Sequence, residues 1–271
     1  MICINNGSLV IAGGNKINCL NRKAGQIIWE FDVQEEILSG PVEKDGIIYF
    51  TAGEGSLYAV DLSDGKEVWS FMVKGAPSVQ YLSNPIIVGN TVFFSSGLSN
   101  VLFAIDIATH EERWKVEDLN SHNASLFADE TNVYLVNGDG GIYAFDADNG
   151  SMKWEKNIGS SIITDCTLMD GNLYFYSYDN HIFSIDLNNG DTDFEYIFEG
   201  KFGIADICVT QDRLFITTYE DLASIDLNGN NFMSYRLDSC PAKKIVLFEK
   251  EAYITTTDNR LVKYTLNTND L

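Results

Sequence analysis

The stretch from Ala59 to Trp69, AVDLSDGKEVW, decides the fold, because its pattern returns about every 40 residues along the chain. Related copies run from Ala104 to Trp114 (AIDIATHEERW) and from Ala144 to Trp154 (AFDADNGSMKW). Aligning the acidic position of the copies gives seven anchors, at Asn21, Asp61, Asp106, Asp146, Asp186, Asp226 and Thr265. Subtraction gives steps of 40, 45, 40, 40, 40 and 39 residues, so seven units fill the 271 residues and leave no room for a second domain.

Each unit predicts four short strands, called A to D, which alternate aromatic or β-branched residues with small or polar ones. In the second unit strand A lies near Gly40 to Val42, strand B at Ile47 to Thr51, strand C at Ser56 to Asp61 and strand D at Glu67 to Phe71. A lone sheet of this size cannot bury both faces, so neighbouring sheets must stack as the blades of a propeller. The sequence therefore predicts an all-β fold: a single seven-bladed β-propeller of four-stranded antiparallel blades, one domain over residues 1–271.

Large aromatic residues recur in strand D, where they are expected to close the interfaces between blades. They are Trp29, Trp69, Trp114, Trp154 and, in the fifth unit, Phe194.

Closure of the ring leaves two alternatives. In the first, Ile2 to Ile4 form strand A of the first blade, because Gly7 matches Gly46, and the seventh blade has only three strands. In the second, Met1 to Ile4 complete the seventh blade.

The pattern Ala-x-Asp-x-x-x-Gly-Lys-x-x-Trp between Ala59 and Trp69 resembles the tryptophan-docking repeat of pyrroloquinoline-quinone-type propellers. That family includes quinoprotein alcohol dehydrogenases and the propeller lipoprotein of outer-membrane assembly. The resemblance covers nearly the whole chain and implies its architecture. Later units depart from the pattern, since Phe194 replaces Trp, His110 replaces Gly and the sixth unit, Ser224 to Tyr235, is irregular. These departures indicate a diverged member that does not hold the quinone.

Motifs that would mark an enzyme or a cofactor site are missing. The three histidines, His110, His122 and His181, lie in different blades without the spacing of metal ligands. The stretches Asp146 to Gly150 and Asp186 to Asp191 place glycine one position too early for a calcium loop, so they predict turns. Quinoprotein dehydrogenases carry adjacent cysteines, a calcium site and a much longer chain. We therefore expect no enzyme, no catalytic residue, no metal and no cofactor.

Composition favours a basic partner. The chain has 18 basic and 39 acidic residues and a net charge of −21, which repels nucleic acid and anionic membranes and attracts basic proteins. The alternative that this charge serves solubility alone stays open. Five widely spaced cysteines predict buried reduced thiols, and the start of the chain, MICINNG, has neither the basic residues nor the apolar run of a signal peptide. Cytoplasmic localisation is therefore expected.

The predicted strand order places the charge unevenly, because the D-to-A and B-to-C loops of an antiparallel blade emerge on the same side. Acids on that side are Asp32, Glu35, Glu36, Glu54, Glu117, Asp118, Asp139, Asp179, Glu199, Glu220, Asp221, Asp238 and Asp258. The opposite side mixes acids with bases, namely Arg22, Lys23, Lys44, Lys66, Arg213 and Lys250. The predicted protein-binding residues are Glu35, Glu36, Glu54, Asp139, Tyr178, Asp179, Phe202, Tyr219, Glu220 and Asp221. Here aromatic side chains supply buried area and carboxylates supply steering. Alternatively, the tyrosines fill the ends of strands.

Two classes of function follow. The first is a non-catalytic propeller that binds and neutralises a basic protein, most specifically an immunity protein that covers the nucleic-acid-binding surface of a toxin domain such as a nuclease. A general assembly scaffold is a broader version of this class. The second is a ligand-binding or enzymatic propeller with its site at the central channel, for which Thr164, Asp165 and Asp206 are the candidate polar groups. We expect the first class.

Overall fold

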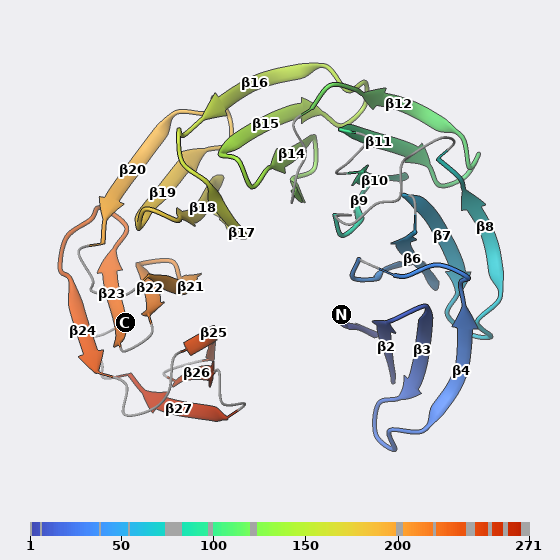
Figure 1. Ribbon diagram of the computed structural model, residues 1–271, viewed down its shortest axis with the longest axis horizontal. Coiled ribbons are helices and arrows are strands. Elements are labelled where there is room, and N and C mark those ends of the chain that lie inside the picture. The colour runs from blue at the N-terminus through green and yellow to red at the C-terminus, as the bar shows by residue number, and fades with distance from the viewer. Residues whose placement is uncertain are drawn as a thin grey trace. The chain divides into compact units, whose positions relative to one another are not determined.

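The computed structural model describes residues 2–5, 7–37, 39–53, 55–73, 83–96, 100–119, 124–198, 203–218, 221–236, 242–248, 251–256 and 260–266. The secondary structure within these ranges consists of β-strands (Figure 1). The chain forms two compact units, Met1–Lys156 and Asn157–Leu271, and each is described by itself. The single domain over residues 1–271 stays a prediction from the repeat.

Unit 1 contains four antiparallel sheets, each with four strands in chain order. The first two sheets are β1 (Ile2–Asn5), β2 (Ser8–Gly13), β3 (Lys16–Asn21) and β4 (Ile27–Asp32), then β5 (Val42–Lys44), β6 (Ile47–Ala52), β7 (Ser56–Asp61) and β8 (Glu67–Phe71). The next two are β9 (Ile86–Val88), β10 (Thr91–Ser96), β11 (Val101–Asp106) and β12 (Glu112–Val116), then β13 (Ser125–Ala128), β14 (Asn132–Val136), β15 (Gly141–Asp146) and β16 (Met152–Asn157).

Unit 2 contains three antiparallel sheets, of which the described part of the last has three strands. They are β17 (Ile162–Met169), β18 (Asn172–Ser177), β19 (His181–Asp186) and β20 (Thr192–Ile197), then β21 (Ile204–Val209), β22 (Arg213–Thr218), β23 (Asp221–Asp226) and β24 (Met233–Arg236), then β25 (Ala242–Phe248), β26 (Glu251–Thr256) and β27 (Leu261–Thr265).

The seven sheets are the seven predicted blades, which confirms the fold class. In the second blade, strand C (β7) and strand D (β8) have the predicted bounds and strand B (β6) is one residue longer. Strand A (β5) starts later than predicted, at Val42, because Pro41 has no N–H to donate and the Gly40 N–H donates to Asn84 Oδ1 at 2.6 Å. The strand β1 pairs with β2 in the first blade, which confirms the first of the two alternatives for that segment.

The core of each unit lies between neighbouring blades. Val10 and Ile17 of the first blade pack against Ile48 and Phe50 of the second, and similar clusters join the second to the third blade and the third to the fourth. In unit 2 two more clusters join the fifth, sixth and seventh blades. Strands B and C supply most of these side chains, so burial of the blade faces is the main stabilising term.

The strand D aromatics dock onto the C–D turn of the following blade, as predicted. Trp29 Nε1 donates to the Leu62 carbonyl at 2.8 Å, and Trp114 Nε1 donates to the Ala147 carbonyl at 3.1 Å. In unit 2 the Phe194 ring lies against Gly229, where an added Cβ would be 2.7 Å from the ring. The aromatic position therefore ties each of these blades to the next.

His110 preserves the same contact where the repeat lacks glycine. It has a φ of 62°, the left-handed conformation of the glycine that it replaces, and its ring stacks on Trp69 with centroids 4.8 Å apart and planes at 17°. Trp69 therefore still docks onto the C–D turn of the third blade, but it packs against the His110 ring where other blades have glycine.

The acidic anchor of the repeat closes the C–D turn. The Asp61 carboxylate accepts hydrogen bonds from the Ser63 hydroxyl at 2.6 Å and its N–H at 2.7 Å, and these bonds lower the pKa of Asp61. Equivalent turns form at Asn21, Asp106, Asp146, Asp186 and Asp226. Asp146 to Gly150 and Asp186 to Asp191 are therefore turns, as predicted.

Candidate functional site

The B–C turns and D–A loops of unit 1 are fastened to one another by backbone hydrogen bonds. In the loop after β4, the Val33 N–H donates to the Asn15 carbonyl at 2.9 Å and the Ile37 N–H donates to the Gly14 carbonyl at 2.7 Å. The Glu36 carbonyl of the same loop accepts from the Gly53 N–H at 2.9 Å. These bonds join the D–A loop of the first blade to two B–C turns, so the loop presents Glu35 and Glu36 from a fixed backbone.

Glu35 and Glu36 differ in their surroundings. Glu36 is exposed, whereas Glu35 is half-buried because its side chain packs over Gly53, where an added Cβ would lie 1.8 Å from Oε2. That oxygen is buried and has no hydrogen-bond partner within the described residues. One oxygen of Glu35 is therefore turned into the protein, and Glu36 carries the more accessible charge of this loop; the role of Glu35 in partner binding stays a prediction.

Other acids of the same side in unit 1 are partly neutralised by nearby lysines. Lys16 Nζ lies 3.9 Å from Glu30 and 4.0 Å from Asp32, and Lys115 Nζ lies 2.5 Å from Glu117. No ion pair within the described residues reaches Glu36 or the exposed Asp118. Exposed pairs of this kind contribute little stability.

Asp139 lies at the tip of the β14–β15 turn, which the buried Asn137 organises. Asn137 Oδ1 accepts from the N–H groups of Asp139 at 3.1 Å and Gly141 at 2.7 Å. The Asp139 side chain is exposed. This fourth-blade carboxylate is therefore held on a defined turn, on the same side of its blade as the loop of Glu36.

The residues that close these turns were not among those predicted from the sequence. In several blades the last residue of strand B, or in the fourth blade the residue directly after it, is polar, and its side chain binds the backbone across the following B–C turn. These residues are Asn137, Ser177, Thr218 and Thr256. Their spacing of 40, 41 and 38 residues, obtained by subtraction, is the signal that would have found them.

In unit 2 the β18–β19 turn presents Tyr178 and Asp179 together. Tyr178 N donates to the Ser161 carbonyl and Phe198 N donates to the Asn180 carbonyl, both at 2.9 Å, so the turn is tied to two D–A loops. The Tyr178 side chain is 72% exposed. It therefore does not fill a strand end, which removes that alternative for this residue.

Asp179 is held in its ionised form. The Ser177 hydroxyl donates to its carboxylate, which is the main reason that the pKa of Asp179 is lowered. An aromatic side chain and a stable negative charge thus share one rigid turn.

The remaining predicted residues are divided as follows. Asp221 begins β23, is half-buried, and donates its N–H to Thr218 Oγ1 at 2.9 Å. Glu54, Phe202, Tyr219 and Glu220 lie outside the described residues. Glu35, Glu36 and Asp139 belong to unit 1, and Tyr178, Asp179 and Asp221 belong to unit 2.

On the opposite side, one expected surface base is buried. Arg213 Nε and Nη2 lie 3.2 and 3.1 Å from Ser224 Oγ, and Nη2 donates to the Asn231 carbonyl at 2.7 Å. The prediction of an exposed Arg213 is wrong because the guanidinium supports the irregular C–D segment of the sixth blade.

The candidate channel groups show a structural contact. Asp206 on β21 is 4% exposed, and its carboxylate accepts from the Ile245 N–H of the next blade at 2.9 Å, with Lys244 Nζ at 3.7 Å. It therefore joins β21 to β25. The side chains of Thr164 and Asp165 lie outside the described residues, so the proposed carboxylate pair stays a prediction.

The cysteines, histidines and acids of the described residues form no cluster of three or more that could hold a metal ion. Cys19 is buried, and burial raises the pKa of its thiol; Cys166 and Cys208 are half-buried, and none of the three is in a disulfide. His181 Nδ1 lies 2.8 Å from Glu195, and His122 lies outside the described residues. In the described part of the chain, no helix has the length and apolar character that a membrane span requires.

These blades, with their docked aromatics and acidic turns, define a β-propeller of the pyrroloquinoline-quinone type. Residues 3–196 match the family model described as "Outer membrane protein assembly factor BamB", and the chain belongs to this family. The assembly factor BamB of Moranella endobia (strain PCIT) is 25% identical over 188 residues, which are 65% of this chain and 48% of that protein. This chain thus spans about half the length of the curated relatives that it matches.

Similarity extends to an enzyme and to a solved structure. The quinoprotein alcohol dehydrogenase PedH of Pseudomonas putida is 27% identical over 160 residues, which are 52% of this chain and 27% of that enzyme. The crystal structure of BamB from Moraxella catarrhalis superimposes with a TM-score of 0.76 at 13% identity, covering 96% of this chain and 82% of that chain. The latter likeness shows the fold alone.

Proposed function

We propose that this protein is a non-catalytic binding propeller that uses the B–C turns and D–A loops of its blades to bind and neutralise a basic protein. In its most specific form, the protein is a cytoplasmic immunity protein whose acids cover the nucleic-acid-binding surface of a toxin domain, such as a nuclease. The observation that carries the proposal is the set of carboxylates and one aromatic on rigid turns, Glu36, Asp139, Tyr178 and Asp179, in a chain of net charge −21.

Electrostatics support a basic partner. Acids at exposed turn tips attract a positive surface over a Debye length of roughly 8 Å at physiological salt and accelerate encounter. A rigid backbone lowers the entropy lost on docking, and the exposed Tyr178 supplies apolar contact area. The buried contact of Asp206 supports a binding role over a catalytic one, because a carboxylate that holds a neighbouring blade is less available for proton transfer.

The test is a pull-down from the native cell with tagged protein, washed at low and then at high salt. Glu36→Lys and Asp139→Lys are expected to release the partner at lower salt, and Tyr178→Ala to weaken binding at every salt concentration. Asp148→Lys is the matched control, since Asp148 is an exposed acid on a C–D turn of the opposite side. Equal release by the control and by the loop variants would show that overall charge, and not this side, governs binding.

A scaffold in protein assembly is the second candidate, and the family match is the observation that favours it. If the protein is a scaffold, the same pull-down should recover several proteins that stay bound at high salt. If it neutralises a toxin, the pull-down should recover one basic protein. If neither appears and a metabolite co-purifies, the channel becomes the better assignment.

A further inference from the structure

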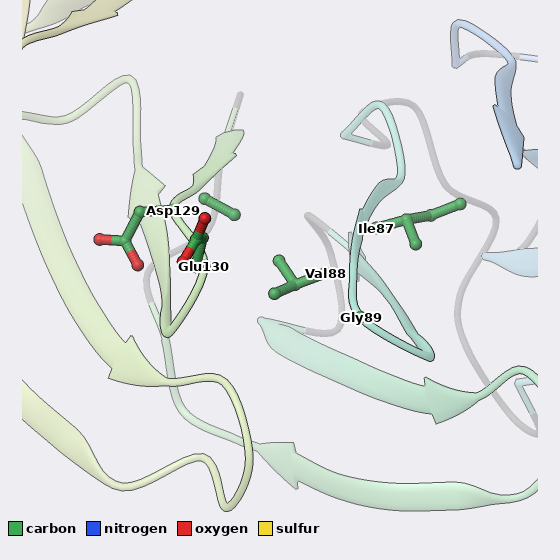
Figure 2. A pocket seen from close by; sticks show the side chains of 6 residues that line it. Ile87, Val88, Gly89, Asp129 and Glu130 are labelled. Carbon is green, nitrogen blue, oxygen red and sulfur yellow. The ribbon is translucent and has the colours of Figure 1, made fainter.

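A pocket of about 380 Å³ opens between the A–B turns of the third and fourth blades, both in unit 1. It is lined by Ile87, Val88, Gly89, Ala128, Asp129 and Glu130. Figure 2 shows the Val88 side chain pointing toward the turn of Glu130, whereas Ile87 points to the other side of its strand. The pocket therefore has an apolar wall on one blade and acids on the other.

The acidic turn is built rigidly. Asp129 accepts from Thr131 N at 2.7 Å, Asn132 N at 2.8 Å and Tyr134 Oη at 2.6 Å. Burial opposes ionisation of this carboxyl, but these hydrogen bonds outweigh it and lower its pKa to about 2. Its oxygens are thus occupied by its own turn, and Figure 2 shows them directed away from Val88. Asp129 supplies fixed negative potential, and Glu130 supplies the free carboxylate.

Space and charge at the opposite wall fit a cation with an apolar stem. A Cβ added at Gly89 would meet nothing within 4 Å, so this wall is open. The nearby base, Lys44, donates from its ammonium to the Gly89 carbonyl. Exposed Glu130 has no ion pair within the described residues.

We propose that this pocket binds a lysine side chain presented by a partner protein, with the alkyl stem against Val88 and Ala128 and the ammonium at Glu130. Lysine suits the geometry because its four-carbon stem buries against apolar surface while its charge stays at the rim. This site lies on the A–B side of the blades, opposite the loops of Glu36 and Asp139, and does not depend on the function proposed for them.

The test is a titration of isotope-labelled protein, followed by amide NMR, with acetyl-Gly-Lys-Gly-amide and with its uncharged norleucine analogue. The lysine peptide is expected to shift the amides of Val88, Gly89 and Ala128 saturably in the millimolar range. Glu130→Gln should weaken binding by about three- to fivefold with the pocket shape retained. Ala128→Leu should abolish it by filling the pocket. Asp170→Asn, an exposed acid on the equivalent turn of the fifth blade, should leave it unchanged.

Three results would overturn the proposal: equal binding of the norleucine peptide, equal weakening by Glu130→Gln and Asp170→Asn, or saturable shifts with spermidine but none with the lysine peptide. The last would assign the pocket to free polyamines. If Ala128→Leu disturbs the whole spectrum, the comparison of Glu130→Gln with Asp170→Asn decides alone.

Discussion

Replacing Gly65 by alanine tests whether the docked tryptophan holds neighbouring blades together. Gly65 has a φ of +73°, and an added Cβ would lie 2.6 Å from Cδ2 and 2.7 Å from Cε3 of Trp29. Gly25 is the same repeat position in the first blade, with a φ of +67° and nothing within 4 Å of an added Cβ. Both N–H groups close the same turn, Gly25 to the Asn21 carbonyl at 2.8 Å and Gly65 to the Asp61 carbonyl at 2.9 Å. The two sites therefore differ chiefly in the aromatic ring.

The expected loss of stability follows from these contacts. Left-handed backbone costs an alanine about 1–2 kcal/mol at either site, offset by about 0.4–1 kcal/mol through the stiffer unfolded chain. At Gly65 the contact below 3.0 Å must be relieved by moving the ring or the turn, which costs about 1–3 kcal/mol more. Movement of Trp29 also loosens its bond to the Leu62 carbonyl, worth about 1 kcal/mol. Gly65→Ala should therefore lower the free energy of unfolding by about 2–4 kcal/mol more than Gly25→Ala.

Urea unfolding of both variants, followed by far-UV circular dichroism and by tryptophan fluorescence, measures the difference. Coincident transitions by the two probes justify a two-state treatment, and separate transitions would be assigned to the two units. Gly65→Ala should also shift fluorescence emission to the red as Trp29 gains solvent. If Gly65→Ala and Gly25→Ala lower the free energy of unfolding equally, within about 0.5 kcal/mol, the reasoning is refuted, because contact with the Trp29 ring would then add no cost at Gly65.

Three further outcomes follow. Asp129→Asn should lower stability by about 1 kcal/mol at pH 7, after allowance for its solvent exposure. Its folded pKa of about 2 lies below the ordinary value of 3.8, so this contribution is present above pH 3.8 and is lost as the pH falls toward 2. Urea midpoints of Asp129→Asn and the unchanged protein should therefore differ at pH 7 and converge near pH 2. Trp114→Phe should lower stability by about 1 kcal/mol through loss of the Ala147 hydrogen bond, measured in the same assay. Tyr178→Ala should change the thermal midpoint little, because the side chain is 72% exposed, while weakening partner capture in the pull-down.

The repeat made most of the fold predictable, because each blade gives the same information again. The second blade shows this well: the bounds of Ser56–Asp61 and Glu67–Phe71 follow from one turn motif and one tryptophan. Strand A is the exception. Its start at Val42 depends on Pro41 and on a bond from Gly40 to Asn84, 44 residues away, which no local pattern contains.

The candidate site was less predictable, because burial of a loop side chain is decided by its neighbours in space. Glu35 looks like Glu36 in the sequence, yet it packs over Gly53 because the loop is fastened to the next blade's turn. Arg213 and Asp206 were expected to face solvent or the channel. Both are instead buried against backbone groups, Asn231 and Ile245, that pattern analysis cannot place near them.

Within the 40-residue units, the residues that hold the blades together differ from those proposed to bind a partner. The acidic anchor, the strand D aromatic and the polar residue at the end of strand B each satisfy a bond inside the blades, and their spacing follows from that duty. The side chains of Glu36 and Tyr178 satisfy no such bond in the contacts described above, and the backbones of Glu36, Asp139 and Tyr178 are held by neighbouring residues. An exposed carboxylate in a chain of net charge −21 experiences net repulsion from the other acids and so contributes little to folding. Under the proposed function the favourable interaction of such carboxylates is with a positive surface outside the chain, and charge reversal at Glu36 with partner binding unchanged would remove the basis for that argument.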